Sequence, residues 1–407
     1  MNILFLCHRF PYPPHAGSKV RAFHMIRHLA LRHRVTVCSI VRTDAEAMAG
    51  EGLADYCDSY RMVRVYEPLQ VLRMMARLPT AEPSSMGYFY DRAFEKEVRS
   101  LLVQNRFDLI VVHCSSVAPY VEHVSDVPKL LDFCDMDSQK WLEYGHYKRF
   151  PLSLGYRLEG IKLERAEARL ARSFDVNTVA TIGELATLEQ IAPAADGDWF
   201  PNGVDAEYFA PSADLYDANT ISFIGRMDYY PNEECMVDFC ARTLPLIRER
   251  RQGIKLVIVG AEPSPKVRRL GEIPGVIVTG SVPDVRPYVW RSAATVAPLN
   301  IARGTQNKIL EAMAMGVPVV SSGIAARGVD AVPGAHLLVA DTPADFATAV
   351  LDILANPTKR QQLAAMGRAR MKSHHAWDSA MKRLDGIIER CLASPRVGAV
   401  SQYAPVK

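Results

Sequence analysis

The chain has 407 residues, of which 49% are hydrophobic and 23% charged, and its formal net charge is +3. This length predicts two domains rather than one, and the composition is that of an ordinary globular protein. A net charge this small argues against a nucleic acid partner, because domains that bind nucleic acids concentrate far more positive charge.

The eight cysteines form no CxxC pair, and most lie inside apolar runs such as ILFLC and VTVCSI. This pattern predicts buried free thiols in a reducing cytosol, since disulfide frameworks are typical of short secreted chains. The chain opens on an apolar strand without the features of a signal peptide, and no run approaches the roughly 20 apolar residues that cross a bilayer. We therefore expect a cytoplasmic protein, attached at most to the inner face of the cytoplasmic membrane.

The first half of the chain alternates short apolar runs with helical patterns. Helices are expected at residues 19–31 and 156–173, and strands at residues 2–7, 35–41, 109–113, 129–133 and 176–181. Strands that alternate with helices predict a parallel sheet covered on both faces.

The loop after the first strand, HRFPYPPHAGSK, holds three prolines and reaches Gly17 just before a helix. Glycine lets a ligand approach the backbone, and the exposed amides of a helix start favour phosphate. An ordinary strand-to-helix turn is the alternative. The loop matches neither GxGxxG nor a Walker loop, so common NAD and ATP folds gain no support.

Residues 61–78, RMVRVYEPLQVLRMMARL, mix arginines with large apolar residues. This composition suits a helix that lies on an anionic membrane with its basic residues outward. It equally suits an amphipathic helix buried within the protein. Both interpretations remain open from the sequence.

Polar residues follow two of the strands in the first half. His113 ends one apolar strand, and Asp135 and Asp137 come directly after the next. Open α/β sheets place their site residues at these carboxyl ends. His113 either reaches a ligand or bonds a backbone carbonyl, and the two aspartates either bind a metal, orient a sugar or cap the following helix.

Turn-forming residues at 199–211, WFPNGVDAEYFAP, separate the first half from a second round of alternation. Strands are expected there at residues 220–224, 255–259, 276–279, 295–297 and 317–321. We predict two doubly wound, Rossmann-like α/β domains, residues 1–203 and 204–375, with a ligand in the crevice between them. A helix at 376–393 is expected to pack back on the first domain, followed by a loose tail at 394–407.

Two stretches of the second half suit a nucleoside diphosphate. The strand end ISFIGRMD places Arg226 where it either holds phosphate oxygens or forms a surface ion pair. In GTQNKILEAMAMGVPVV, the amides near Thr305 and Gln306 mark a helix start, and Lys308 adds a cation. Glu311 lies several residues inside this helix, so it suits a ribose diol better than it suits a cap.

These motifs resemble glycosyltransferase family 4, whose members adopt the GT-B fold. The resemblance covers most of the chain and is carried by the Gly17 loop, His113, PNGVD at 201–205 with Phe209, the Gly225-Arg226 pair, KILEAMA and GVPVV. The segments RMDYYPNEE and GTQNKILEAMAMG further resemble those of sugar transferases associated with bacterial exopolysaccharide and exosortase (PEP-CTERM) loci.

The resemblance implies a retaining hexosyltransferase that moves a sugar from a nucleotide-diphosphate sugar, UDP- or GDP-linked, to a hydroxyl acceptor without an obligatory metal. The acceptor would be a glycan or a lipid-linked sugar in exopolysaccharide or other cell-surface glycan assembly. The implied ligands are Arg226 and Lys308 for the diphosphate, Glu311 for the ribose, Gly17 for phosphate and His113 for the sugar. Asp135 and Asp137 are further sugar or acceptor candidates.

The chain departs from the family pattern at two positions. Arg303 replaces the first of two glutamates that members often carry eight positions apart, and Pro231 replaces a lysine that often follows the arginine of the GR pair. Arg303 then becomes a candidate sugar or phosphate ligand. Two alternatives stay open: a GT-B epimerase with Asp135 and Asp137 as acid and base, and a nonenzymatic assembly protein with a degenerate transferase site.

Overall fold

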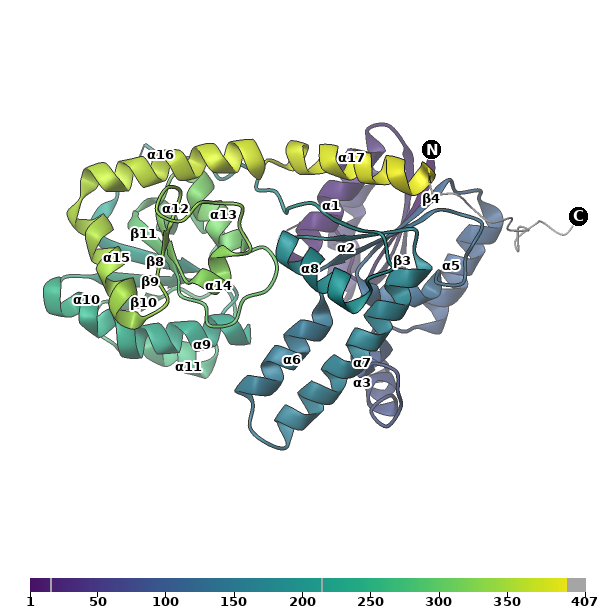
Figure 1. Ribbon diagram of the computed structural model, residues 1–407, viewed down its shortest axis with the longest axis horizontal. Coiled ribbons are helices and arrows are strands. Elements are labelled where there is room, and N and C mark those ends of the chain that lie inside the picture. The colour runs from purple at the N-terminus through teal and green to yellow at the C-terminus, as the bar shows by residue number, and fades with distance from the viewer. Residues whose placement is uncertain (15–16, 214, 394–407) are drawn as a thin grey trace, which may run out of the picture. The chain divides into compact units, whose positions relative to one another are not determined.

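The computed structural model describes residues 1–14, 17–213 and 215–393 (Figure 1). The tail predicted at 394–407 lies outside these residues. The chain divides into two compact units, residues 1–201 with the chain from Met381 onward, and residues 202–380. Each unit is an α/β structure in which helices flank one sheet (Figure 1).

Unit 1 contains a seven-stranded parallel sheet in the order β3-β2-β1-β4-β5-β6-β7. Its strands are β1 (Asn2–Cys7), β2 (Arg34–Val41), β3 (Ser59–Arg64), β4 (Leu109–His113), β5 (Lys129–Cys134), β6 (Val176–Val179) and β7 (Gly197–Trp199). Residues from Ile3 to the end of β1, and the four apolar residues of β4, have no exposed surface. Continuous apolar strands of this kind are typical of parallel sheets that are covered on both faces.

The helices of unit 1 follow its strands in the chain. They are α1 (Gly17–Ala30), α2 (Asp44–Gly50), α3 (Glu67–Ala76), α4 (Ser84–Tyr88), α5 (Arg92–Gln104), α6 (Asp137–Tyr147), α7 (Leu152–Ser173) and α8 (Ile182–Ile191). Helix α5 shows why such segments are helical. Asp91 caps it by accepting from the amides of Ala93 and Phe94, and an apolar stripe that includes Val98 and Leu101 is buried.

Unit 2 contains a six-stranded parallel sheet in the order β10-β9-β8-β11-β12-β13. Its strands are β8 (Asp217–Ile224), β9 (Lys255–Val259), β10 (Val276–Val278), β11 (Ser292–Ala297), β12 (Val319–Ser321) and β13 (Leu338–Val339). Its helices are α9 (Tyr230–Asp238), α10 (Leu244–Arg250), α11 (Pro265–Leu270), α12 (Arg286–Trp290), α13 (Asn307–Ala314), α14 (Gly323–Ala326), α15 (Pro343–Ala355) and α16 (Pro357–His374). The last helix, α17 (Trp377–Ala393), begins in unit 2, and its residues from Met381 belong to unit 1.

Both sheets reverse their strand order at one point, between β1 and β4 in unit 1 and between β8 and β11 in unit 2. The prediction of two doubly wound α/β domains is therefore confirmed. In sheets of this type, ligands bind beyond the carboxyl ends of the strands at the point of reversal. These ends are Cys7 and His113 in unit 1, and Ile224 and Ala297 in unit 2.

Two further sequence expectations concern cysteines and the membrane. All eight cysteines are free thiols; six are buried as predicted, and Cys57 and Cys134 are half-buried. Among the residues that the structure describes, none of the helices combines the length and apolar character needed to span a bilayer.

Candidate functional site

In unit 2, the side chain of Lys308 lies where three elements meet. Lys308 is the second residue of α13, and its half-buried ammonium donates to Asn232 Oδ1 at 2.5 Å and lies 4.6 Å from the centre of the Phe223 ring. Asn232, in α9, donates in turn to the backbone carbonyl of Arg226 at 2.7 Å. The carboxyl end of β8, the first turn of α9 and the start of α13 are therefore joined through one amide and one ammonium.

Glycine at position 225 leaves space beside this ammonium. A Cβ at Gly225 would lie 2.7 Å from Asn232 Nδ2 and 3.5 Å from Lys308 Nζ. Gly260, at the end of β9, has a φ of +156°, and a Cβ there would lie 1.8 Å from the carbonyl oxygen of Gly225. Only glycine fits at position 260, so the ends of β8 and β9 approach each other closely beneath the site.

Lys308 and Glu311 are one helical turn apart, and the charge of each group affects the pKa of the other. Burial lowers the pKa of the Lys308 ammonium to about 8, while the nearby Glu311 carboxyl and Cys235 thiol act in the opposite direction. Burial raises the pKa of the Glu311 carboxyl to about 7, and the positive charge of Lys308 opposes it. Glu311 is the fifth residue of α13, too far inside to cap it, and within the described chain no hydrogen bond reaches its carboxyl.

The start of α13 has polar groups that the protein itself does not satisfy. Gln306 is the N-cap residue, but its side chain donates to the carbonyl of Arg303 at 2.9 Å instead of capping the helix. In the described part of the chain, the buried Thr305 Oγ1 and Asn307 Oδ1 have no hydrogen-bond partner. Unpaired buried polar atoms are costly, and a helix start attracts anions, so this turn suits an anionic, hydroxyl-bearing ligand.

Arg226 forms the ion pair that the sequence left open as the alternative to phosphate binding. Its guanidinium donates to Asp228 Oδ1 at 3.0 Å and to Glu262 Oε2 at 2.5 Å, and its side chain is 59% exposed. Asp228 and Glu262 raise the pKa of the guanidinium. A phosphate that binds Arg226 at Nε or Nη2 therefore competes with two carboxylates.

The two departures from the family pattern also have locations in unit 2. Pro231 is the second residue of α9, directly before Asn232, so the backbone at this position leads into the residue that contacts Lys308. Arg303 is half-buried, five residues before Lys308, and its carbonyl accepts from Gln306. The structure thus gathers Arg303, Thr305, Gln306, Lys308 and Glu311 at the start of α13.

In unit 1, His113 belongs to a buried network of charged groups. His113 Nδ1 lies 2.8 Å from Asp132 Oδ2, and both residues are buried. Arg21, in α1, donates to both oxygens of Asp132 at 2.9 Å, and Thr178 Oγ1 donates to Oδ1 at 2.9 Å. The alternative that His113 bonds a backbone carbonyl is therefore wrong, because its partner is a carboxylate from the neighbouring strand.

This network keeps the Asp132 carboxyl ionised. Burial opposes the charge on Asp132, yet Arg21 and His113 hold the pKa of its carboxyl well below the usual range. An ionised carboxylate only accepts hydrogen bonds, so His113 Nδ1 carries a proton in this contact. The second ring nitrogen, Nε2, takes no part in the hydrogen bond to Asp132. Arg21 also donates to the carbonyl of Phe200 and stacks over its ring at 3.5 Å.

Asp135 and Asp137 do not cap α6, so that interpretation is wrong. The N-cap position is Met136, and the amides of Met136 and Ser138 are bonded by Glu184 and Glu167, at 2.8 and 3.0 Å. Two glutamates from other helices have taken the capping role.

The same carboxylates crowd the turn between β5 and α6. Burial, together with Glu184 and Asp137, raises the pKa of Asp135 to about 7, and Asp135 Oδ1 has no hydrogen-bond partner in the described residues. Burial also raises the pKa of Asp137. Within the described ranges, no three His, Cys, Asp or Glu side chains are grouped so that they could hold a metal ion. Asp135 remains available to accept or donate a proton.

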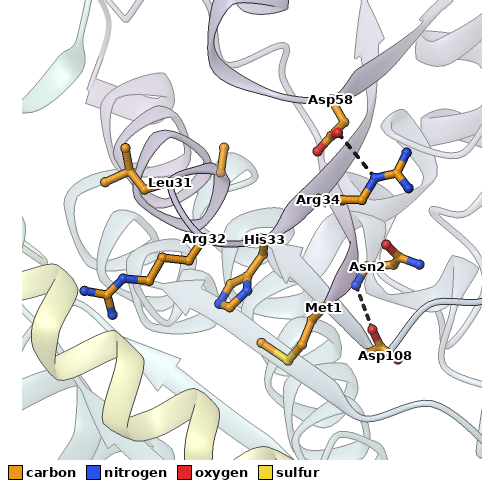
Figure 2. A pocket seen from close by; sticks show the side chains of 9 residues that line it. Met1, Asn2, Leu31, Arg32, His33, Arg34, Asp58 and Asp108 are labelled. Atoms are coloured by element: carbon orange, nitrogen blue, oxygen red, sulfur yellow. Dashed lines mark hydrogen bonds and ion pairs between the residues drawn. The ribbon is translucent and has the colours of Figure 1, made fainter.

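Gly17 is the first residue of α1, at the carboxyl-end side of β1, while residues 15–16 of the same loop lie outside the described residues. A hollow of about 440 Å³ lies at the opposite, amino ends of the strands, by the first residues of β1 and β2. Figure 2 shows its lining, in which Asn2 pairs with Asp108 and Arg34 with Asp58. It holds none of the predicted site residues.

Residues 61–78 do not form a single helix. Residues 59–64 form the edge strand β3, and helix α3 follows from Glu67 to Ala76. The expectation that basic residues face outward is wrong for α3, because Arg73 donates to Asp91 Oδ2 at 2.6 Å and to the carbonyl of Tyr90.

Comparison with known proteins supports a glycosyltransferase. Residues 218–356 match the family model described as Glycosyl transferases group 1, so a domain of this kind lies in unit 2. The range contains Arg226, Lys308 and Glu311. It covers less than half of the chain, and unit 1 lies outside it.

A curated relative is the GDP-mannose-dependent monoacylated alpha-(1-6)-phosphatidylinositol monomannoside mannosyltransferase of Corynebacterium glutamicum. It is 24% identical over 212 residues, and the match spans 46% of this chain and 55% of the relative. The chain thus aligns with about half the length of that protein.

Solved structures resemble the chain over nearly its whole length. Sucrose-phosphate synthase from Thermosynechococcus elongatus has a TM-score of 0.71 at 16% identity, covering 97% of this chain and 100% of the other. HepE from Anabaena, in a structure with UDP-glucose, has a TM-score of 0.68 at 13% identity, covering 96% and 99%. These likenesses show the fold, which is the two-domain GT-B fold.

Proposed function

We propose that this chain is a glycosyltransferase that moves a sugar from a nucleotide-diphosphate sugar to a hydroxyl acceptor. One observation carries the proposal above the others. The start of α13 combines the Lys308 ammonium, which lies beside Gly225 at a carboxyl end of the unit 2 sheet, with the Glu311 carboxyl and two polar side-chain atoms that have no partner in the described residues. A diphosphate attached to a ribose has the charge and the hydroxyls that complement this set.

In this proposal, unit 2 holds the nucleoside diphosphate. Lys308 and the amides at the start of α13 bind phosphate oxygens, and Thr305 and Gln306 contribute from the turn before the helix. Glu311 accepts hydrogen bonds from the ribose hydroxyls. Arg226 joins the phosphate ligands, in competition with Asp228 and Glu262 for its guanidinium.

The chemistry that follows is electrostatic. As the sugar leaves the diphosphate, negative charge develops on the departing phosphate, and fixed positive groups stabilise it. Loss of one such preorganised donor costs about 3–4 kcal/mol, or about 10²–10³ in rate, in comparable oxyanion sites. Lys308 is suited to this role because Asn232 and Phe223 already hold its ammonium in position.

We further infer that the sugar keeps its anomeric configuration. The acceptor hydroxyl would attack from the side of the leaving diphosphate, whose oxygen accepts the hydroxyl proton, so that no covalent sugar intermediate is required. His113 and Gly17 would contact the sugar and phosphate from unit 1, as the family resemblance implies. Asp135, Asp137 and Arg303 are the remaining candidates for the sugar or the acceptor.

The donor and the acceptor are proposed at the level of class. The mannosyltransferase relative is described as GDP-mannose-dependent, and HepE has been solved with UDP-glucose, so UDP- and GDP-sugars are the donors to test first. The relative acts on a phosphatidylinositol monomannoside. We propose a glycan or lipid-linked acceptor in the assembly of an exopolysaccharide or another cell-surface glycan.

Epimerisation of a sugar nucleotide is the second candidate, and it is favoured by Asp135, whose raised pKa suits an acid or base. Purified protein should be incubated with UDP- and GDP-hexoses, with and without octyl glucoside as a hydroxyl acceptor, and followed by proton NMR. Transfer predicts nucleoside diphosphate and a retained anomeric signal in the new glycoside, both lost in Lys308→Ala. A changed sugar without acceptor would instead establish epimerisation, and no reaction with any donor would favour a nonenzymatic role.

A further inference from the structure

Helix α3 is amphipathic, but it exposes its apolar side, whereas an ordinary surface helix buries that side. Two of its polar side chains face the protein: Gln70 is 2% exposed and donates to Asp91, and Arg73 donates to the same carboxylate, while Glu67 at its first position is exposed. Leu69, Leu72 and Met75 are exposed. A helix on a water-facing surface normally buries its apolar stripe, so this orientation indicates that the apolar side meets something other than water.

The hairpin formed by α6 and α7 exposes a second apolar set at its tip. Phe150 is 80% exposed, Leu152 63%, and Leu154 and Leu158 50% each. The helices beneath this tip are firmly packed, because Tyr156 contacts Trp141 and Tyr144, and Gly160 lets Leu142 approach its backbone. The tip is therefore presented on a rigid support.

The two apolar sets lie side by side in unit 1. Lys162, in α7, donates to the carbonyls of Arg77 and Leu78 just after α3, and the buried Glu159 accepts from the amides of Ser84 and Ser85 in α4. Figure 1 shows α6 and α7 extending together beyond the unit 1 sheet, with α3 next to α7. Of the 24 large hydrophobic side chains exposed in the described residues, twelve lie in residues 66–78 and 147–161. We call these two segments the apolar face.

The charges near the hairpin tip have one sign. Residues 144–158 contain Lys148, Arg149 and Arg157, and no aspartate or glutamate. Arg149 and Arg157 are exposed. Exposed aromatic and leucine side chains among basic residues complement a lipid surface that offers acyl chains below a layer of anionic headgroups.

We propose that the apolar face docks unit 1 on an anionic phospholipid bilayer, with Phe150, Leu152 and the outward side of α3 entering the interface. The observed charge argues against a second copy of the chain as the occupant, because a symmetric pair would bring the two basic tips together. The docking surface differs from the expectation for residues 61–78, since Arg73, the one arginine of α3, points inward and the basic residues come from the hairpin. It is independent of which sugar the chain transfers.

Vesicle co-sedimentation tests the proposal. The full chain is expected to bind phosphatidylcholine vesicles that contain about 30% phosphatidylglycerol, and to bind pure phosphatidylcholine vesicles at least about tenfold more weakly. The double variant Phe150→Ser/Leu152→Ser should lose about tenfold or more in affinity, and Arg149→Glu/Arg157→Glu should lose the preference for anionic lipid. Leu31→Ser, at a 77% exposed leucine elsewhere in unit 1, and Arg106→Glu, at an exposed arginine, are the matched controls and should bind normally.

Insertion has its own measurement. Tryptophan emission from Phe150→Trp should shift to shorter wavelength when the anionic vesicles are added, whereas Leu31→Trp should show no shift. The proposal is overturned if the full chain binds neither kind of vesicle, or if the Phe150 and Arg149 variants bind as the wild type does. It is also overturned if Phe150→Ser/Leu152→Ser converts a dimer to a monomer, because the apolar face would then be a protein interface. Unchanged melting temperatures exclude misfolding as the cause.

Discussion

His113 Nδ1 lies 2.8 Å from Asp132 Oδ2, and the same carboxylate accepts two hydrogen bonds from the Arg21 guanidinium. The strand that ends at His113 and the helix that begins at Gly17 are therefore tied to one buried charge on β5. Arg21 is 1% exposed and Asp132 has no exposed surface. If His113 contacts the sugar, its ring is oriented by this pair rather than by solvent.

Removing that charge should destabilise unit 1. Asp132→Asn would leave the Arg21 guanidinium buried without its counter-ion, and loss of one partner of a buried ion pair costs about 3–5 kcal/mol. Urea denaturation followed by circular dichroism measures the loss.

Asp385→Asn provides the matched control. Asp385 Oδ1 also lies 2.8 Å from a histidine nitrogen, His28 Nε2, but the two side chains are 31% and 20% exposed. A pair this accessible contributes less than about 1 kcal/mol. Equal losses in the two variants would contradict a special role for the buried Asp132 charge.

Two carboxylates bind Arg226, so removing one of them is expected to raise the affinity for a nucleoside diphosphate. Glu262→Gln removes one of the two ion pairs that compete with a phosphate for Arg226, and exposed pairs contribute about 0.2–1 kcal/mol each. The affinity for UDP or GDP, measured by isothermal titration calorimetry, should therefore rise by up to about fivefold. Arg226→Ala should lower it. If both variants bind as the wild type does, Arg226 has no part in the site.

The affinity for a nucleoside diphosphate should also depend on pH in two opposite ways. Below about pH 7 Glu311 is protonated, so it accepts ribose hydrogen bonds poorly, and above about pH 8 Lys308 loses the charge that attracts phosphate. The affinity is thus expected to be highest between these two values. Glu311→Gln should remove the acid-side change, and Lys308→Arg the alkaline one. Identical pH profiles in the wild type and both variants would exclude these groups as the titrating ligands.

Glu167 predicts a stability change with pH. Burial raises the pKa of its carboxyl to about 8, so the protonated form is favoured in the folded chain. This group contributes stability below its unfolded pKa, and that contribution is lost as the pH rises through about 8. Glu167→Gln keeps an acceptor for the Ser138 amide without the charge. It should therefore be about 1 kcal/mol or more stabler than the wild type above that pH, and similar in acid.

The control for this prediction is Glu189→Gln in α8, at an exposed position. It should change the free energy of unfolding by less than about 0.5 kcal/mol at every pH. Urea denaturation at acid and alkaline pH compares the three proteins. A Glu167→Gln variant that follows the wild type across the range would show that Glu167 is ionised in the folded state.

The sequence predicts ten of the strands and the placement of Glu311, because both depend on local patterns, but it misses the edge strands β3, β7 and β13. Continuous apolar runs mark strands buried on both faces, and the helical period of residues 307–314 places Glu311 beyond reach of the helix start. The partners of the site residues are a different matter. Arg21 and Asp132 are 111 residues apart, and Lys308 and Asn232 are 76 apart, so no local spacing predicts them.

The sequence does contain an indication for some of the site residues that the sequence analysis did not identify. Asp132 lies inside the apolar strand sequence KLLDFC, where an unpaired charge would be costly. The sequence therefore indicates that Asp132 has a buried partner, but it does not identify that partner. Glu167 and Glu184 give no such sign, because glutamates on helices are usually solvated. Residues 61–78 illustrate a further limit, since composition alone does not reveal that Arg73 of α3 faces inward.

The most direct test of the proposed donor site is a thermal-shift measurement with UDP, GDP, ADP and dTDP on the wild type and on Lys308→Ala. A ligand at 100 times its dissociation constant stabilises the folded chain by about 2.7 kcal/mol, enough to raise the melting temperature detectably. Lys266→Ala, at an exposed lysine of the same unit, is the control. We predict that at least one nucleotide stabilises the wild type and Lys266→Ala, and that Lys308→Ala loses most of this effect. Equal stabilisation of all three proteins, or no stabilisation of the wild type by any nucleotide, would contradict a nucleoside diphosphate site at the start of α13.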